Sequence, residues 1–182
     1  MELMVTTPAR TDKPPGAGHR RQSQLWGATA LAVVLHNTEE CLLDMTGWIA
    51  EHPWLPGRSL HGDPAEFALV LALVTLAVLG LAAVAVGTRP RWSATVLACV
   101  ACALMVNGAG HVVLSLLSWS PMPGLVSGVA LLLPLGTLVS RELPPVRWTS
   151  STVTLATLAA VGLTAGAFAL AAVLTALVGR VA

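Results

Sequence analysis

The chain has 182 residues, of which 55% are hydrophobic and only 10% are charged. A soluble domain usually carries about 25% charged residues, so this chain has too few to cover a water-facing surface. Its formal net charge of +1 excludes the strongly basic surface that a nucleic-acid partner requires. The composition therefore predicts a protein surrounded by membrane lipids, with no nucleic-acid partner.

Residues 1–23 are polar and rich in Pro, Gly and Arg, and we expect them to form a mobile tail. Residues 24–182 contain apolar runs that each approach or exceed the ~20 residues needed to cross a bilayer. Because backbone groups find no water there, such runs must be helical. The sequence predicts an all-α polytopic membrane protein, a single five-helix domain with spans at about 25–45, 66–86, 92–117, 125–140 and 151–178 and an external loop at 46–65.

The basic residues indicate how these spans are oriented. If five helices alternate, only Arg58 and Arg180 fall on one side of the membrane. The other side receives Arg20, Arg21, Arg89, Arg91, Arg141 and Arg147. Since cytoplasmic loops carry an excess of Lys and Arg, we expect a cytoplasmic N-terminus and an external C-terminus. His52 and His61 then lie in the external loop, where their role is open.

Two Gly-x-x-x-Gly steps run from Gly124 to Gly128 and from Gly162 to Gly166. In lipid such steps let helix backbones approach closely. They suit packing within one chain or between two, so a homo-oligomer formed through these faces is one expectation. Pro134, inside the fourth predicted span, indicates a kink.

The first predicted span contains ionisable residues that need a local reason to be there. His36, Glu39 and Glu40 lie in the run VVLHNTEECLLD, and a charged side chain at a helix centre costs about 2.5–3.5 kcal/mol on the lenient insertion scale. At about 100° per residue, these three side chains occupy one arc of roughly 100°. They therefore face the same neighbour.

The third predicted span offers a matching partner, because Asn107 and His111 lie four residues apart in MVNGAGHVV. At ~1.5 Å per residue, Glu40 lies about 24 Å along its helix, and Asn107 and His111 lie about 22 and 28 Å along theirs. The polar groups of the two helices therefore converge in the outer half of the bilayer. Two neighbouring carboxyls resist being charged together, which favours a shared proton or a bound cation.

These residues, in this order, resemble the HXXEE family of membrane proteins. The resemblance rests on His36-x-x-Glu39-Glu40, on Asn107-x-x-x-His111, on Pro123-Gly124 and on LLLP ending at Pro134. It covers most of residues 25–140 and departs from the family pattern before Pro123, where Ser120-Pro121-Met122 replaces the expected Tyr-x. The resemblance implies a multi-pass protein of a bacterial cytoplasmic membrane. It implies no activity, because the family is functionally uncharacterised.

Imidazole and carboxylate side chains together suit zinc, iron or manganese. The first hypothesis is therefore a metal-dependent intramembrane enzyme, with Asn107 as a ligand or as the group that orients one. The metal ligands would be His36, Glu39, Glu40 and His111. Because two helices rather than four supply them, we expect one divalent metal. The substrate would be an apolar, lipid- or isoprenoid-like small molecule that enters from the bilayer.

Three alternatives remain open at this point. A metal-free isomerase or terpene-cyclase-like enzyme would use acid–base catalysis, with a protonated Glu39 or Glu40 as the acid and a histidine as the base. A proton- or cation-coupled transporter or a channel subunit would use the same groups as a relay. A purely structural polar network is the last alternative. The catalytic residues of either enzyme would be His36, Glu39, Glu40, Asn107 and His111.

Overall fold

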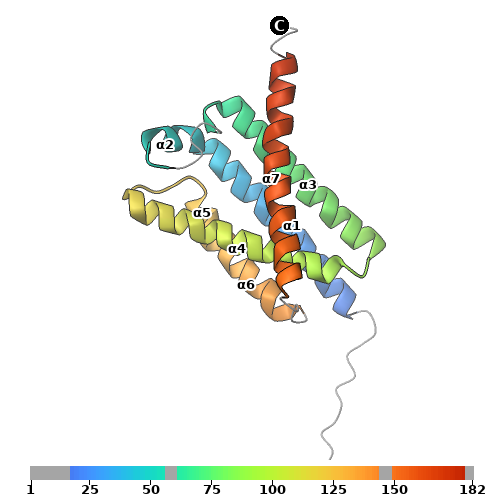
Figure 1. Cartoon of the computed structure of the whole chain (residues 1–182). Helices are drawn as coiled ribbons and strands as arrows, with labels where there is room; N and C mark the ends of the chain where they lie inside the picture. Colours follow the sequence, from blue (N-terminus) through green and yellow to red (C-terminus); the bar gives the residue numbers. More distant parts are fainter. Residues whose placement is uncertain (1–16, 56–60, 144–148, 179–182) are drawn as a thin grey trace, which may run out of the picture.

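The computed structural model describes residues 17–55, 61–143 and 149–178, and every regular element in these ranges is helical. Figure 1 shows α1 (Ala17–Leu42), α2 (Met45–Glu51), α3 (Pro64–Thr88), α4 (Ser93–Ser118), α5 (Leu125–Ser127), the π-helix η2 (Gly128–Leu132), α6 (Leu133–Glu142) and α7 (Ser150–Val178). Four segments are long and apolar enough to cross a membrane, namely α3, α4, the α5–η2–α6 run Leu125–Glu142 and Ala156–Val178 in α7. The predicted all-α membrane fold is confirmed.

α1 is as long as these segments but is not among the four, because polar and charged side chains interrupt its apolar face. It begins at Ala17, so residues 17–23 of the predicted tail form its first turns, and residues 1–16 lie outside the described residues. The helix ends at Leu42, since Asp44 adopts a left-handed backbone conformation with φ 54°. α1 therefore carries its ionisable residues close to one end.

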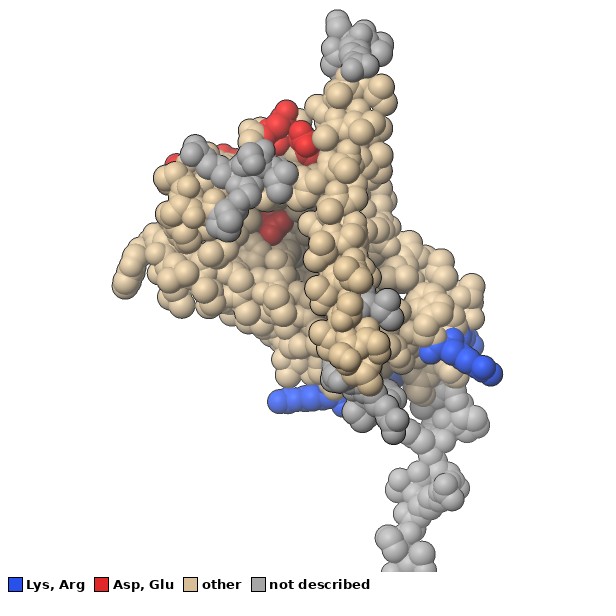
Figure 2. Space-filling model, in the orientation of Figure 1, with Lys and Arg blue, Asp and Glu red and all other residues tan. Residues whose placement is uncertain are grey.

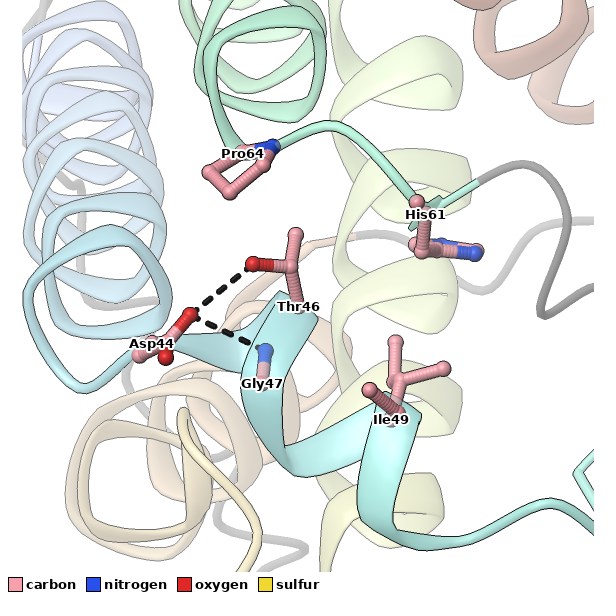
Figure 3. A pocket seen from close by; sticks show the side chains of 8 residues that line it. Asp44, Thr46, Gly47, Ile49, His61 and Pro64 are labelled. Carbon is pink, nitrogen blue, oxygen red and sulfur yellow. Dashed lines mark hydrogen bonds between the residues drawn. The ribbon is translucent and has the colours of Figure 1, made fainter.

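α2 begins at Met45, the last residue of the first predicted span, and otherwise lies in the predicted external loop at 46–65, where the sequence pattern indicates no helix. The Asp44 carboxylate caps it by accepting hydrogen bonds from the Gly47 N–H at 2.9 Å and from the Thr46 hydroxyl at 2.8 Å (Figure 3). These two bonds lower the pKa of Asp44 below its ordinary value. α2 then buries Trp48 in an apolar cluster with side chains of α3 and of the segment before α5. The loop is thus folded back onto the bundle.

The long helices form two groups that meet along α1. α1 packs along α3 and α3 along α7, whereas α4 packs along η2 and α6 (Figure 1). α1 also touches α4, α5, η2 and α6, although over shorter stretches. Near the N-terminal end of α1 the groups share a core of Leu25, Trp26, Ala30, Ala82, Ala85, Leu97, Ala101 and Val139. α1 is therefore the element that joins the two halves.

α7 contributes less to the bundle than the other long helices. It packs against α3 through Ala167 and Ala171, which are buried with Val70, and most of its remaining length is exposed. A Cβ added at Gly162 or Gly166 meets no atom within 4 Å. This Gly-x-x-x-Gly step has no packing role inside the described chain, and a homo-oligomer formed through it stays a prediction.

Charged side chains gather at the two ends of the bundle. Figure 2 shows Lys and Arg at the end where α3 meets α4, whereas most Asp and Glu lie toward the opposite end. At the basic end Arg21 of α1 pairs with Glu142 of α6 at 3.2 Å. Between the ends many large apolar side chains are exposed, as expected for a surface that faces hydrocarbon. The molecule thus has one basic end, one acidic end and an apolar belt.

Pro134 lies near the start of α6, directly after the π-helix η2. Proline lacks an N–H, and its ring clashes with the carbonyl four residues earlier, so an α-helix cannot run through it undisturbed. A π turn is one local adjustment that helices make at such points. Here it directly follows Ser127 and begins at Gly128, and both of these residues face the interior.

Candidate metal site

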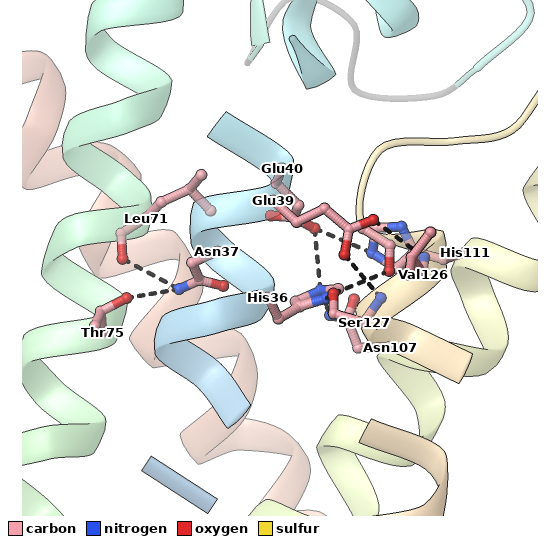
Figure 4. Close-up of polar contacts among 11 residues, drawn as sticks. His36, Asn37, Glu39, Glu40, Leu71, Thr75, Asn107, His111, Val126 and Ser127 are labelled. Carbon is pink, nitrogen blue, oxygen red and sulfur yellow. Dashed lines mark hydrogen bonds and ion pairs between the residues drawn. The ribbon is translucent and has the colours of Figure 1, made fainter. Parts of the chain in front are cut away.

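Three ionisable side chains meet between α1 and α4, away from the basic end. Glu40 Oε1 lies 3.0 Å from His111 Nε2 and 3.3 Å from His36 Nε2. All three residues are buried, and one ligand atom of each lies within 4.8 Å of the others. Figure 4 shows them turned toward one another from the two helices. We refer to His36, Glu40 and His111 as the His–Glu–His group.

Both ring nitrogens of His36 have polar neighbours. Nδ1 lies 2.8 Å from Ser127 Oγ, and Nε2 lies 2.8 Å from Asn107 Nδ2. An amide nitrogen can only donate, so Nε2 accepts from Asn107, and the neutral ring carries its proton on Nδ1. His36 therefore donates to Ser127, and its Nε2 lone pair accepts the Asn107 amide beside Glu40.

Glu40 and His36 consequently present two acceptor atoms to each other, 3.3 Å apart. A carboxylate oxygen and an imidazole lone pair repel at this distance unless a proton or a cation lies between them. His111 Nε2 can donate to Glu40, whereas the lone pair of His36 Nε2 already accepts the Asn107 amide. His111 Nδ1 is itself buried without a hydrogen-bond partner in the described chain. A proton or a cation at the centre of the group would remove the remaining repulsion between Glu40 Oε1 and His36 Nε2.

Glu39 lies beside the His–Glu–His group. Its carboxylate accepts the backbone N–H of Val126 at 3.1 Å and that of Ser127 at 2.7 Å (Figure 4). Backbone amides at the start of a helix lack partners within the helix, and a carboxylate stabilises them there. Both oxygens of Glu39 therefore bind the α5–η2 segment. Of the four predicted ligands, the structure brings together His36, Glu40 and His111, and it directs Glu39 elsewhere.

Glycines allow the rings to come this close. Gly124 has φ +89°, and a Cβ added there would lie 2.6 Å from His111 Cε1 and 2.9 Å from His36 Cε1. The two imidazole rings meet edge to face, with centroids 4.8 Å apart. A Cβ at Gly108 would lie 3.0 Å from the carbonyl oxygen of Gly128. The step from Gly124 to Gly128 thus serves close packing within this chain.

Ser127 is the residue at this site that the sequence pattern does not predict. A signal for it exists, because it is a polar residue three positions after Gly124 in an otherwise apolar run. By contrast, Asn37 is polar and next to His36 but binds elsewhere. It donates to Thr75 Oγ1 at 2.8 Å and to the carbonyl oxygen of Leu71 at 3.2 Å, which ties α1 to α3.

Asn107 lies at the rim of the site. Its amide bonds to the buried ring of His36, yet the residue is exposed, and the neighbouring Val106 is 74% exposed. In Figure 2 a hollow opens between α7 and α4, with acidic surface at its bottom. The polar centre is therefore close to the part of the surface that faces hydrocarbon.

A family model described as a protein of unknown function with an HXXEE motif matches residues 27–139. The chain belongs to this family. The match runs from α1 into α6 and contains the whole His–Glu–His group, whereas α7 lies beyond it. No curated protein and no solved structure matches the chain. Membership of the HXXEE family brings no activity with it, so the function must be argued from the site.

Proposed function

We propose that this HXXEE protein is a membrane enzyme that holds one divalent transition metal through His36, Glu40 and His111. The observation that carries the proposal is the spacing of the ligand atoms. With metal–ligand bonds of about 2.0–2.2 Å, two ligands of one metal stand roughly 3.0–3.5 Å apart. Glu40 Oε1 lies 3.0 and 3.3 Å from the two imidazole nitrogens. A cation at the centre would also separate the two facing acceptors.

The donor set narrows the choice of metal. Two histidines and one carboxylate hold catalytic zinc in some hydrolases and non-haem iron in oxygenases. We therefore propose zinc or iron, with manganese as the third candidate. Such a metal, when bound, supplies Lewis-acid activation of a substrate or of water. Its binding at His36 Nε2 requires Asn107 to release that atom, which frees the Asn107 amide to contact a substrate.

The surroundings of the site support an apolar substrate. We place α1 as a fifth membrane span beside the four candidate spans, with the basic end in the cytoplasm of a bacterial cell and the C-terminus outside. The His–Glu–His group then lies in the outer half of the cytoplasmic membrane. The exposure of Asn107 and Val106 supports entry of a lipid- or isoprenoid-like molecule from the bilayer.

A proton carried by Glu40 is the second way to remove the repulsion between these two acceptors. The bond from Asn107 to His36 Nε2 favours this metal-free form, because it occupies the lone pair that a metal would use. Glu40 would then be the general acid toward an alkene or epoxide, and a histidine would take the proton back. The reaction would be an isomerisation or a cyclisation of the same class of substrate.

Elemental analysis of the full-length protein in detergent separates these possibilities. We expect stoichiometric metal in the wild type and loss of that metal in Glu40→Gln and in His111→Ala. Ser93→Ala, which removes a buried hydroxyl elsewhere between α1 and α4, is the matched control and should keep the metal. A wild type that takes up no metal after anaerobic reconstitution with zinc, iron and manganese would overturn the metal proposal and favour acid–base chemistry.

Transport is tested separately, in liposomes. We expect no proton flux through the reconstituted protein. A flux that disappears in Glu40→Gln would instead identify the buried carboxylate as part of a relay.

A further inference from the structure

We infer that Ser127 and Glu39 position His36 for metal binding, so that the α5–η2 segment belongs to the metal site although it supplies no ligand. The inference rests on the proposed metal site. It assigns different roles to the two adjacent glutamates of the motif, with Glu40 as a ligand and Glu39 as a positioning residue.

Ser127 and Asn107 together decide which nitrogen of His36 carries the proton, and Ser127 is the one that remains when a metal displaces Asn107 from Nε2. A neutral imidazole has one N–H and one lone pair, and the hydrogen bond made by one nitrogen selects the state of the other. Ser127 Oγ lies 2.8 Å from Nδ1, and both residues are buried. With a proton on Nδ1, the lone pair lies on Nε2, which faces Glu40 and His111. This is the tautomer that a metal requires.

The alternative tautomer would close the site. When Asn107 releases Nε2, as metal binding requires, and Nδ1 has no acceptor, the proton can shift to Nε2, which lies 3.3 Å from Glu40 Oε1. That N–H would bond to the carboxylate and occupy the position between the ligands. The bond between His36 and Ser127 therefore keeps the centre of the His–Glu–His group available to a cation.

The Ser127 hydroxyl has acceptors other than His36 for its own proton. Ser127 Oγ lies 3.4 Å from the carbonyl oxygen of Gly124, which can only accept. The Glu39 carboxylate is a second acceptor beside Ser127 Oγ. A hydroxyl proton directed to either acceptor leaves an oxygen lone pair for His36. Ser127 Oγ can therefore accept the hydrogen bond from His36 Nδ1.

Glu39 holds Ser127 in place. Its two oxygens bind the N–H groups of Val126 and Ser127 at 3.1 and 2.7 Å, one helical turn from the bond that His36 makes to Ser127. α1 therefore contacts the α5–η2 segment at two adjacent points. Loss of the Glu39 contact would let Ser127 Oγ move away from His36 Nδ1.

Cobalt(II) is a suitable probe, because its visible absorption reports both binding and coordination geometry. We would titrate Co²⁺ into metal-free, full-length protein in detergent. Loss of a hydrogen-bond partner behind a ligating histidine typically weakens metal binding about 10–100-fold. We expect a loss of that size in Ser127→Ala, together with an altered absorption band. Ser127→Thr, which keeps the hydroxyl, should return the affinity to within a few-fold of wild type.

Glu39→Gln tests the second step. One amide oxygen replaces two carboxylate oxygens, so we expect weaker Co²⁺ binding, by a smaller factor than in Ser127→Ala. Because Glu39 acts through Ser127, the double variant should bind about as weakly as Ser127→Ala alone rather than showing the product of both losses. Ser93→Ala, the matched control, should bind Co²⁺ as tightly as the wild type.

The outcomes are distinguishable. A wild type that binds no Co²⁺ overturns the proposed metal site itself. A wild type and Ser127→Ala with equal affinities and equal spectra overturn the positioning role and leave the metal site standing. If Ser127→Ala does not fold, Ser127→Cys replaces it, since a thiol has a similar size but is a weak acceptor. Wild-type affinity in that variant would equally overturn the inference.

Discussion

Two polar junctions connect α1 to α4, and they differ in kind. At the inner junction, near the basic end, Ser93 Oγ accepts Trp26 Nε1–H at 2.8 Å and Gln22 Nε2–H at 2.9 Å. The two donors and the acceptor at this junction are all neutral groups. At the outer junction, the His–Glu–His group, a carboxylate oxygen lies 3.3 Å from an imidazole nitrogen that is also an acceptor, and His111 Nδ1 has no hydrogen-bond partner in the described residues.

The inner junction has the features of a structural contact, and the outer junction has those of a candidate functional site. A junction that only holds helices together needs matched donors and acceptors, and in lipid one such bond contributes roughly 1 kcal/mol. Buried ionisable groups such as those of the outer junction stabilise a fold less than apolar side chains of the same size would. Proteins retain such groups where function requires them, at a cost in stability.

The largest effect is expected from Gly124→Ala. The added Cβ would lie 2.6 Å from His111 Cε1, at a backbone φ of +89° that alanine rarely adopts. We expect a loss of about 1–3 kcal/mol of stability from the strained backbone and at least about 100-fold weaker metal binding, since a ring displaced by even 1 Å no longer fits. Thermal unfolding in detergent and Co²⁺ titration measure the two effects.

Gly110→Ala is the control for this variant, because a Cβ at Gly110 meets nothing within 4 Å. Alanine is the better helix former by about 0.5–1 kcal/mol, so this change should leave metal binding intact and preserve or raise stability. Wild-type metal binding in Gly124→Ala would contradict the tight packing of the two rings on this backbone.

The second prediction concerns the sign of the stability change at the outer junction. Replacing His36, Glu40 and His111 together by leucine removes the buried ionisable groups and keeps side chains of similar volume. Such exchanges are often neutral or stabilising by about 1–4 kcal/mol. We expect the metal-free triple variant to unfold at or above the wild-type temperature and to bind no metal. Strong destabilisation would show that the outer junction is structural after all.

The helical layout of the chain and the similar depth of Glu40 and His111 follow from the sequence. Apolar runs give the membrane segments, and spacing with rise per residue places Glu40 and His111 at similar heights on two helices. The start of α1 at Ala17 and the presence of α2 do not follow. Polar first turns and a short capped helix carry no apolar period, so their helicity depends on tertiary contacts such as the pair of Arg21 and Glu142.

The role of Ser127 and the direction of Glu39 could not be predicted, because they depend on local backbone geometry. An α-helical register through the fourth span fixes no contact between Ser127 and His36. That contact needs the positive φ of Gly124 and the π turn after Ser127. The helical arc likewise places Glu39 on the site face of α1, but only the position of the Val126 and Ser127 amides shows what its carboxylate binds.

The smallest effect on metal binding is expected at the inner junction, where a variant tests the structural member of the pair. Ser93→Ala leaves the buried N–H of Trp26 without its acceptor, and an unsatisfied buried donor costs about 1–3 kcal/mol. The variant should unfold at a lower temperature and bind Co²⁺ as the wild type does. Adding Trp26→Phe removes the orphaned donor, so the double variant should recover part of the loss. If Ser93→Ala instead weakened metal binding, the two junctions would be coupled through α1, and the division between a structural and a functional junction would fail.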